Sequence, residues 1–188
     1  MTLIVAILLV TRPAVAGKAP ATASLRLGAQ ALPASHPFPA VGLYGTLPIG
    51  DRLSVGLGYE LLRVFDGTLT TSTDTGAGPL IAGGLRAGIW RHGPREHGVF
   101  ARAGVCLGVV SPLISPARLP SSMDPGSLVV EGTLDVMAGY AWPRVRVILF
   151  SAPTYSYGRF TSSGPGFSGH ADVSAFSLTA GAGVMLTF

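Results

Sequence analysis

Residues 176–188 read FSLTAGAGVMLTF, and every second side chain in this stretch is apolar. A repeat of two residues with one apolar face is typical of a half-buried β-strand, because successive strand side chains point to opposite faces. The stretch therefore predicts a strand that ends the chain on an aromatic residue. The apolar face consists of Phe176, Leu178, Ala180, Ala182, Val184, Leu186 and Phe188.

The composition extends this reading to the whole chain. Charged residues make up 12% of the 188 residues, about half of the ~25% found in typical soluble domains. The mean hydropathy is +0.50, yet no apolar run reaches the ~18 residues that a transmembrane helix needs. A transmembrane β-barrel combines these properties, because its lipid-facing and lumen-facing side chains alternate. The 26 glycines and 15 prolines also favour strands and turns over helices.

Alternating segments recur along the chain, and we expect eight strands. Longer connections alternate with shorter turns, as in bacterial barrels, which have an even number of strands, short periplasmic turns and longer outer loops. The sequence therefore predicts an all-β, eight-stranded antiparallel up-and-down transmembrane barrel. The expected strands span 22–32, 39–48, 52–65, 79–91, 98–110, 127–142, 144–157 and 171–188. The longer loops lie near 33–38, 66–78, 111–126 and 158–169, and the shorter turns near 48–51, 91–98 and 142–144.

The first residues have the features of a secretory signal peptide. Residues 3–10 form a short apolar core, and Ala14-Val15-Ala16 matches a cleavage site before Gly17. We expect a signal peptide over 1–16 and one barrel domain over 17–188. The alternative is that the apolar core is a buried strand of a cytosolic protein.

The apolar core, the eight segments, the rhythm of the connections and the terminal Phe188 together resemble the small OmpA/OmpX-type outer-membrane barrels. The resemblance covers nearly all of the chain after residue 16. It implies a location in the outer membrane of a Gram-negative bacterium, contact with outer-membrane lipid, and a monomeric barrel. It also implies that the barrel-assembly machinery recognises the last strand, with Phe188 as the assembly signal. Such barrels include adhesins, structural anchors, carriers and a few lipid-modifying enzymes, so the fold leaves the function open.

The remaining composition narrows the function classes. The formal net charge is +4, but the basic residues are scattered, which argues against nucleic-acid binding. Cys106 is the single cysteine and can form no disulfide within the chain. His92 and His97 flank an expected turn without a cluster of further ligands, so we expect no metal site and no cofactor.

Charged residues on the expected lumen face form the main candidate site. Folding adjacent strands places Glu60 beside Arg86, Arg86 near Arg102, and Arg102 near Asp135. An eight-stranded barrel has an interior just filled by side chains, and charges buried there need partners. The cluster is therefore expected to be a structural plug of ion pairs, and the alternative is a gated pore or a ligand-orienting site. The expected members are Glu60, Arg86, Arg102, Glu131, Asp135 and Arg146.

Three functions remain open at this point. The first is an outer-membrane barrel with a structural or surface-interaction role through its outer loops, which is not an enzyme. The second is a membrane-embedded lipid-modifying hydrolase, in which His170, Asp172 and Ser174 share one strand face and act as a relay. The third is a soluble, lipocalin-like carrier. The charges opposite the Leu/Val face argue against the carrier, because charges inside a barrel leave the apolar face outside.

Overall fold

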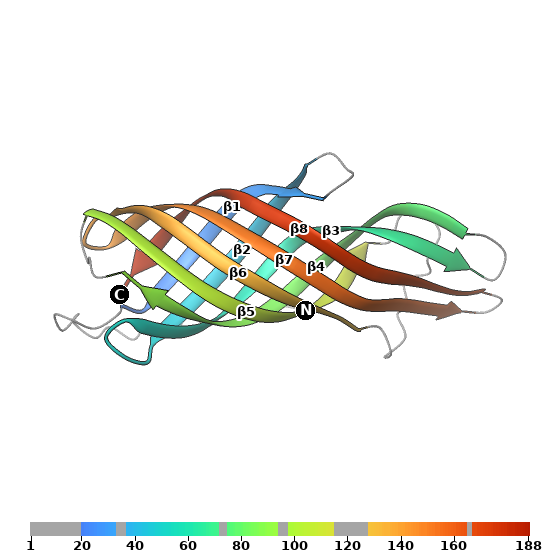
Figure 1. The fold of residues 1–188 in the computed structure, drawn as a ribbon, viewed down its shortest axis with the longest axis horizontal. Coiled ribbons are helices and arrows are strands. Elements are labelled where there is room, and N and C mark those ends of the chain that lie inside the picture. The colour runs from blue at the N-terminus through green and yellow to red at the C-terminus, as the bar shows by residue number, and fades with distance from the viewer. Residues whose placement is uncertain (1–19, 33–36, 72–74, 94–97, 115–127, 165–166) are drawn as a thin grey trace.

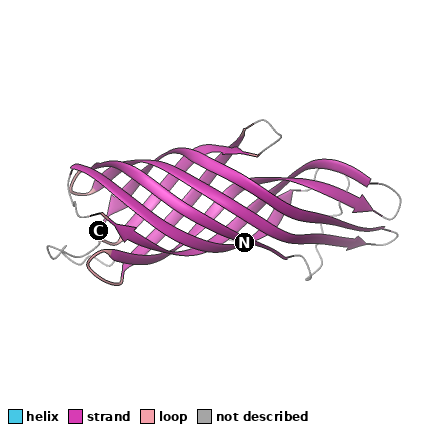
Figure 2. Ribbon diagram, in the orientation of Figure 1, coloured by secondary structure: helices cyan, strands magenta, loops and turns pink. Residues whose placement is uncertain are grey.

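The computed structural model describes residues 20–32, 37–71, 75–93, 98–114, 128–164 and 167–188. The expected signal peptide over 1–16 lies outside these residues. All regular structure in the described part of the chain is β-strand (Figure 2). No helix among the described residues is long and apolar enough to cross a membrane. The strands are β1 (Thr22–Ala31), β2 (Phe38–Pro48), β3 (Leu53–Thr71), β4 (Thr75–His92), β5 (Gly98–Ile114), β6 (Leu128–Ala141), β7 (Val145–Gly164) and β8 (Phe167–Thr187).

Each strand pairs antiparallel with the next, and β1 pairs with β8 to close the barrel (Figure 1). The predicted eight-stranded up-and-down barrel is therefore confirmed. The first and last strands pair from Thr22 opposite Thr187 to Ala31 opposite Leu178. The backbone N–H of Phe188 donates to the carbonyl of Ala21 at 3.0 Å, which continues this seam to the last residue. We call the end with the short turns 49–52 and 142–144 the turn end, and the opposite end the hairpin end.

The predicted alternation of faces is present along the strands. In β6, side chains alternate strictly between exposed and buried from Leu128 to Ala138. The apolar side chains are the ones that point outward, as with Leu107 (76% exposed) and Leu149 (65% exposed). Their neighbours in the sequence point into the lumen, and these include Cys106 and Ile148. An apolar outer wall and a partly polar interior are the inverse of a soluble carrier, and they match a barrel surrounded by lipid.

Several strands are longer than predicted. The stretches 66–78 and 158–169 were expected to be loops because they are rich in Gly, Ser and Thr, but most of each lies in a strand. The β3–β4 pairing continues to Thr70 opposite Thr75, and the β7–β8 pairing continues to Gly164 opposite Phe167. Cross-strand hydrogen bonds outweigh the weak strand preference of the glycines, while the threonines are themselves compatible with strands.

A second contact holds the longer strands together. Because β1 and β2 end earlier, β3 pairs directly with β8 beyond them, from Thr68 opposite Asp172 to Thr71 opposite Gly169. The strands β4, β3, β8 and β7 thus form a continuous four-stranded sheet at the hairpin end. Figure 1 shows the β3–β4 and β7–β8 hairpins projecting side by side from the same end of the barrel.

The lumen is filled by side chains in layers. An apolar cluster lies toward the hairpin end, and a second cluster, centred on Trp90, lies toward the turn end. Charged and polar groups occupy the space between and beside these clusters. The cluster toward the hairpin end consists of Ala82, Val110, Val129, Phe160, Ala171 and Val173.

Candidate functional site

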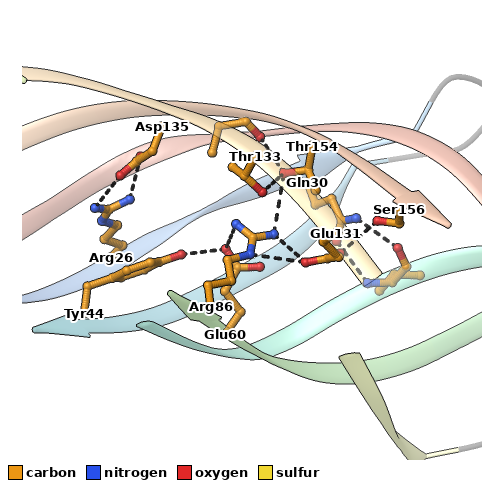
Figure 3. A network of polar contacts seen from close by, with 12 residues as sticks. Arg26, Gln30, Tyr44, Glu60, Arg86, Glu131, Thr133, Asp135, Thr154 and Ser156 are labelled. Carbon is orange, nitrogen blue, oxygen red and sulfur yellow. Dashed lines mark hydrogen bonds and ion pairs between the residues drawn. The ribbon is translucent and has the colours of Figure 1, made fainter. Parts of the chain in front are cut away.

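The first polar group in the lumen is centred on Arg86 of β4, and we call it the Arg86 cluster. Its guanidinium lies between two carboxylates, with Nη1 2.9 Å from Glu60 Oε1 and Nη2 2.8 Å from Glu131 Oε2. Tyr44 donates its hydroxyl to Glu60 at 2.7 Å, and Ser156 donates to Glu131 at 2.8 Å. Five strands thus supply one hydrogen-bonded layer across the lumen (Figure 3).

The local sequence explains why these groups meet. Glu60 and Arg86 lie on the lumen-facing parity of β3 and β4, and the register places Arg86 opposite Gly58. Arg86 is also opposite Gly108 of β5, which in turn is opposite Glu131. A Cβ on Gly108 would approach the Arg86 side chain to 2.8 Å, so the glycine leaves room for the guanidinium stem.

The second group is centred on Asp135 of β6, and we call it the Asp135 cluster. Arg26 of β1 binds the carboxylate with both terminal nitrogens, at 2.8 and 3.0 Å. Trp90 donates its indole N–H to Asp135 Oδ2 at 2.6 Å. The guanidinium of Arg26 also stacks on the ring of Tyr44, 3.9 Å from its centroid, which links the two clusters. Bidentate pairs of this kind are among the strongest polar contacts in proteins.

Arg102 and Arg146 lie at the turn end of the lumen, where Arg102 adjoins the Asp135 cluster through Trp90. Arg102 donates from Nη2 to Ser54 at 3.3 Å and lies 4.8 Å from the centre of the Trp90 ring. Arg146 lies over the ring of Phe100, 5.1 Å from its centroid. All six residues expected in the lumen cluster are buried, but they divide into these separate groups.

The structure adds direct partners that the expected neighbour relations did not include. Asp135 binds Arg26 and Trp90 directly, and Arg102, which was expected near Asp135, packs on the ring of the same Trp90. Arg86 is bound by acids on both sides, Glu60 and Glu131. The physical reason is barrel closure, because adjacent-strand reasoning does not include contacts across the lumen from β1 to β6. The alternation of β1 could have indicated Arg26, since its neighbours Leu25 and Leu27 face outward.

A further polar contact joins the ends of the shorter and longer strands. Gln30 of β1 is fully buried, and its side-chain amide bonds both backbone groups of Val64 in β3. The amide nitrogen donates to the Val64 carbonyl at 2.9 Å, and the Val64 N–H donates to the amide oxygen at 3.0 Å. The Gln30 amide thus makes the two hydrogen bonds that the backbone of a neighbouring strand would make with β3 at this point. Sequence reasoning did not select Gln30.

The candidate relay His170, Asp172 and Ser174 lies on the outer wall near the hairpin end. Arg159 of β7 binds both oxygens of Asp172, and His170 Nε2 is 3.9 Å from Asp172. The Ser174 hydroxyl is hydrogen-bonded to Tyr155 at 3.1 Å. The hydrogen bonds from Arg159 hold the pKa of Asp172 below its ordinary value. The acid is therefore paired with arginine and the serine with tyrosine, so these contacts do not form a serine–histidine relay.

The described residues offer no group of three or more His, Cys, Asp or Glu side chains that could hold a metal ion. Cys106 is buried in the lumen. The carboxylates of the lumen are bonded to arginine, tyrosine, tryptophan or serine, so the chemistry visible in the lumen is mutual charge neutralisation across the barrel.

Comparisons with known proteins agree with the fold. No protein-family model matches the sequence, and no curated protein matches it significantly. Neisserial surface protein A (NspA) has a similar structure, with a TM-score of 0.54 and 13% identity over 89% of this chain and 96% of that one. The N-terminal β-barrel domain of Pseudomonas aeruginosa OprF gives a TM-score of 0.48 at 11% identity, covering 89% of this chain and 97% of that chain.

The attachment invasion locus protein Ail of Yersinia pestis is a more distant match, with a TM-score of 0.32 and 11% identity over 89% of this chain and 98% of that one. The likeness to NspA is the one that supports the fold assignment, and at 13% identity it does not extend to activity. Together with the closed antiparallel topology and the apolar outer wall, it defines the architecture. The chain is therefore an eight-stranded β-barrel with the fold of the small outer-membrane proteins.

Proposed function

We propose that the protein is an outer-membrane barrel of a Gram-negative bacterium that displays the β4–β3–β8–β7 sheet outside the cell as a surface-interaction element. The observation that carries the proposal is the direct pairing of β3 with β8 beyond the ends of β1 and β2. This pairing joins two hairpins into one sheet, which is more than a membrane anchor requires.

The dimensions of the outer wall support the membrane position. The exposed apolar side chains of β7 run from Val145 to Tyr157. These twelve steps span about 40 Å along the strand at ~3.3 Å each, or about 28 Å along the membrane normal at the usual tilt of ~45°. That height fits the apolar band of ~25 Å and its aromatic borders in bacterial barrels.

Aromatic side chains support the same borders. Tyr140 and Trp142 are exposed near the turn end, with ring centroids 4.7 Å apart. Tyr155 and Tyr157 are exposed toward the hairpin end. Such residues favour the two membrane–water interfaces, because their rings are apolar and their polar groups reach water.

The part of the sheet beyond Tyr157 would then stand outside the membrane. The β7–β8 ladder continues there from Arg159 opposite Asp172, and the exposed ion pair between these two residues suits a hydrated setting. The short turns at the other end would face the periplasm. A barrel with its lumen crossed by the Arg86 and Asp135 clusters is suited to anchoring and display more than to conduction.

Tag accessibility tests the orientation. A tag inserted at Thr73, between β3 and β4, should be detected by antibody on intact cells. A matching tag at Arg144, in a short turn, should be detected only after the outer membrane is opened. Detection of the Arg144 tag alone on intact cells would show the opposite orientation.

Trimming the projecting sheet tests the role. A variant in which Asp66 is joined to Pro79, and Arg159 to Asp172, by short turns keeps the barrel pairs below them. It should still migrate as a heat-modifiable barrel on a gel. Attachment of the cells to surfaces should fall while their detergent resistance stays unchanged. The reverse result would favour a purely structural role in the membrane.

A further inference from the structure

Arg102 is a buried cation to which no described residue presents a directly bonded carboxylate. Its side chain is 2% exposed, and its described contacts are one long hydrogen bond to Ser54 and the face of Trp90. Its Nε has no hydrogen-bond partner within the described part of the chain. A guanidinium has five N–H donors, and a buried charge without an opposite charge or full hydrogen bonding is costly.

The nearby carboxylate is already in use. Both oxygens of Asp135 are bonded to Arg26, and Oδ2 also accepts the indole N–H of Trp90. Among the described residues, the buried carboxylates are Glu60, Glu131 and Asp135, and the first two belong to the Arg86 cluster. The buried charge of the lumen is therefore unevenly distributed, with positive charge concentrated at the turn end.

The neighbours of Arg102 add donors and further positive charge. Ser54 accepts from Arg102 and also lies 2.9 Å from Nε2 of His92. If the serine hydroxyl donates to Nε2, the neutral imidazole carries its proton on Nδ1 and is itself a donor. His92 lies directly opposite Arg102 in the β4–β5 register, and Arg146 also lies at this end of the lumen.

Trp90 separates this region from the rest of the lumen. The indole packs against Gly104 and Gly88, where an added Cβ would come within 2.3 and 2.8 Å of its ring. Its N–H is held by Asp135 and its face is turned to Arg102. Along β4, Trp90 lies between Arg86 and His92, which is opposite Arg102, so the Arg102 region is on the turn-end side of the indole.

We propose that Arg102 and the Nδ1–H of His92 bind a small oxyanion at the turn end of the lumen, with Ser54 orienting both side chains, and that this anion supplies the missing counter-charge. Arginine suits such a ligand, because its planar fork donates paired hydrogen bonds to oxyanions. The site goes beyond the proposed surface role and is separate from the projecting sheet. In the proposed orientation it would be filled from the periplasm.

Inorganic phosphate is the probe for a test by fluorescence. The chain has two tryptophans, so a Trp142→Phe background leaves Trp90 as the reporter beside Arg102. The full-length barrel is folded in maltoside micelles, which contain no phosphate, and titrated at constant ionic strength. We expect a saturable change in Trp90 fluorescence and a melting temperature that rises with phosphate, as for any ligand of the folded state.

Two matched variants locate the effect. Arg102→Gln should weaken phosphate binding about tenfold or more, as for loss of a charge-assisted contact. Arg159→Gln, which removes an exposed arginine from the other end, should change binding less than about twofold. If Arg102→Gln does not fold, Arg102→Lys is the second variant. It keeps the positive charge but should still bind phosphate more weakly, because lysine cannot donate the paired hydrogen bonds of a guanidinium.

The proposal is overturned by any of three results. These are a folded parent with no saturable response, a response that is equal in the Arg102 variant, and a response seen only when anionic phospholipid is added. The last result would assign the counter-charge to a lipid headgroup instead of a free oxyanion.

Discussion

Arg26 and Asp135 are 109 residues apart in the chain and form a bidentate ion pair across the lumen. The pair joins β1 to β6, which are not neighbours in the barrel. Both side chains are buried, and Trp90 completes the bonding of the carboxylate. The pair therefore ties opposite walls of the barrel together, independently of the backbone ladder.

Breaking this pair should be costly. Asp135→Ala leaves Arg26 buried without its acid, and we expect a loss of about 3–5 kcal/mol in the free energy of unfolding. Urea unfolding in lipid vesicles measures it. The double variant Arg26→Met, Asp135→Leu should recover much of the loss, because it removes both charges together. A single variant as stable as the parent would contradict the role of the pair.

A glycine pair tests the close packing of Trp90. Gly104→Ala places a Cβ within 2.3 Å of the indole, whereas Gly132→Ala meets no atom within 4 Å. The first should destabilise the barrel by about 1–3 kcal/mol through overpacking, and the second should be close to neutral. The measurement is urea unfolding together with the emission of Trp90 in the Trp142→Phe background. Equal stabilities would show that Trp90 can move away.

Gln30 should protect the backbone of β3. Gln30→Leu leaves the N–H and carbonyl of Val64 without their described partner, at a cost of about 1–3 kcal/mol. Amide hydrogen exchange should accelerate at Val64 more than at Tyr59, whose strand neighbours are unchanged. Unchanged protection at Val64 would mean that another group takes over the bonds.

The exposed ion pair between Arg159 and Asp172 should lower the pKa of Asp172. Arg159 lowers the pKa of this carboxyl from its ordinary value of 3.8. A lowered folded-state pKa contributes stability that is present above pH 3.8 and is lost as the pH falls through the lowered pKa. In Arg159→Gln the pKa should rise toward 3.8, as measured by carboxyl carbon NMR. An unchanged titration would show that the pair does not persist in solution.

The role of Phe188 as an assembly signal remains a prediction. Removing it should reduce insertion into the outer membrane, because the machinery is expected to read the last strand. Phe188→Tyr keeps an aromatic terminus and serves as the matched control. The yield of heat-modifiable barrel in outer-membrane fractions measures the effect. Equal yields from the deletion and the control would remove this role.

The sequence by itself determined which way the side chains of each strand face. Alternation is a local property, so residues such as Leu107 and Arg102 could be assigned to opposite faces of one strand without knowledge of the fold. The same alternation predicted the eight strands, and the rhythm of long and short connections predicted their antiparallel order. It also placed Glu60 and Arg86 on one face of adjacent strands, where the structure joins them.

Only the tertiary structure decided the partners across the lumen and the lengths of the projecting strands. Asp135 pairs with Arg26 because closure of the barrel brings β1 opposite β6, a contact that no hairpin register contains. The stretch from Thr68 to Thr71 is a strand because β8 supplies hydrogen bonds on one side and β4 on the other. Its threonines are compatible with a strand, but the stretch lies in a polar segment without a clear apolar face, and the backbone pairing that makes it a strand is a non-local interaction that single-residue preferences do not encode.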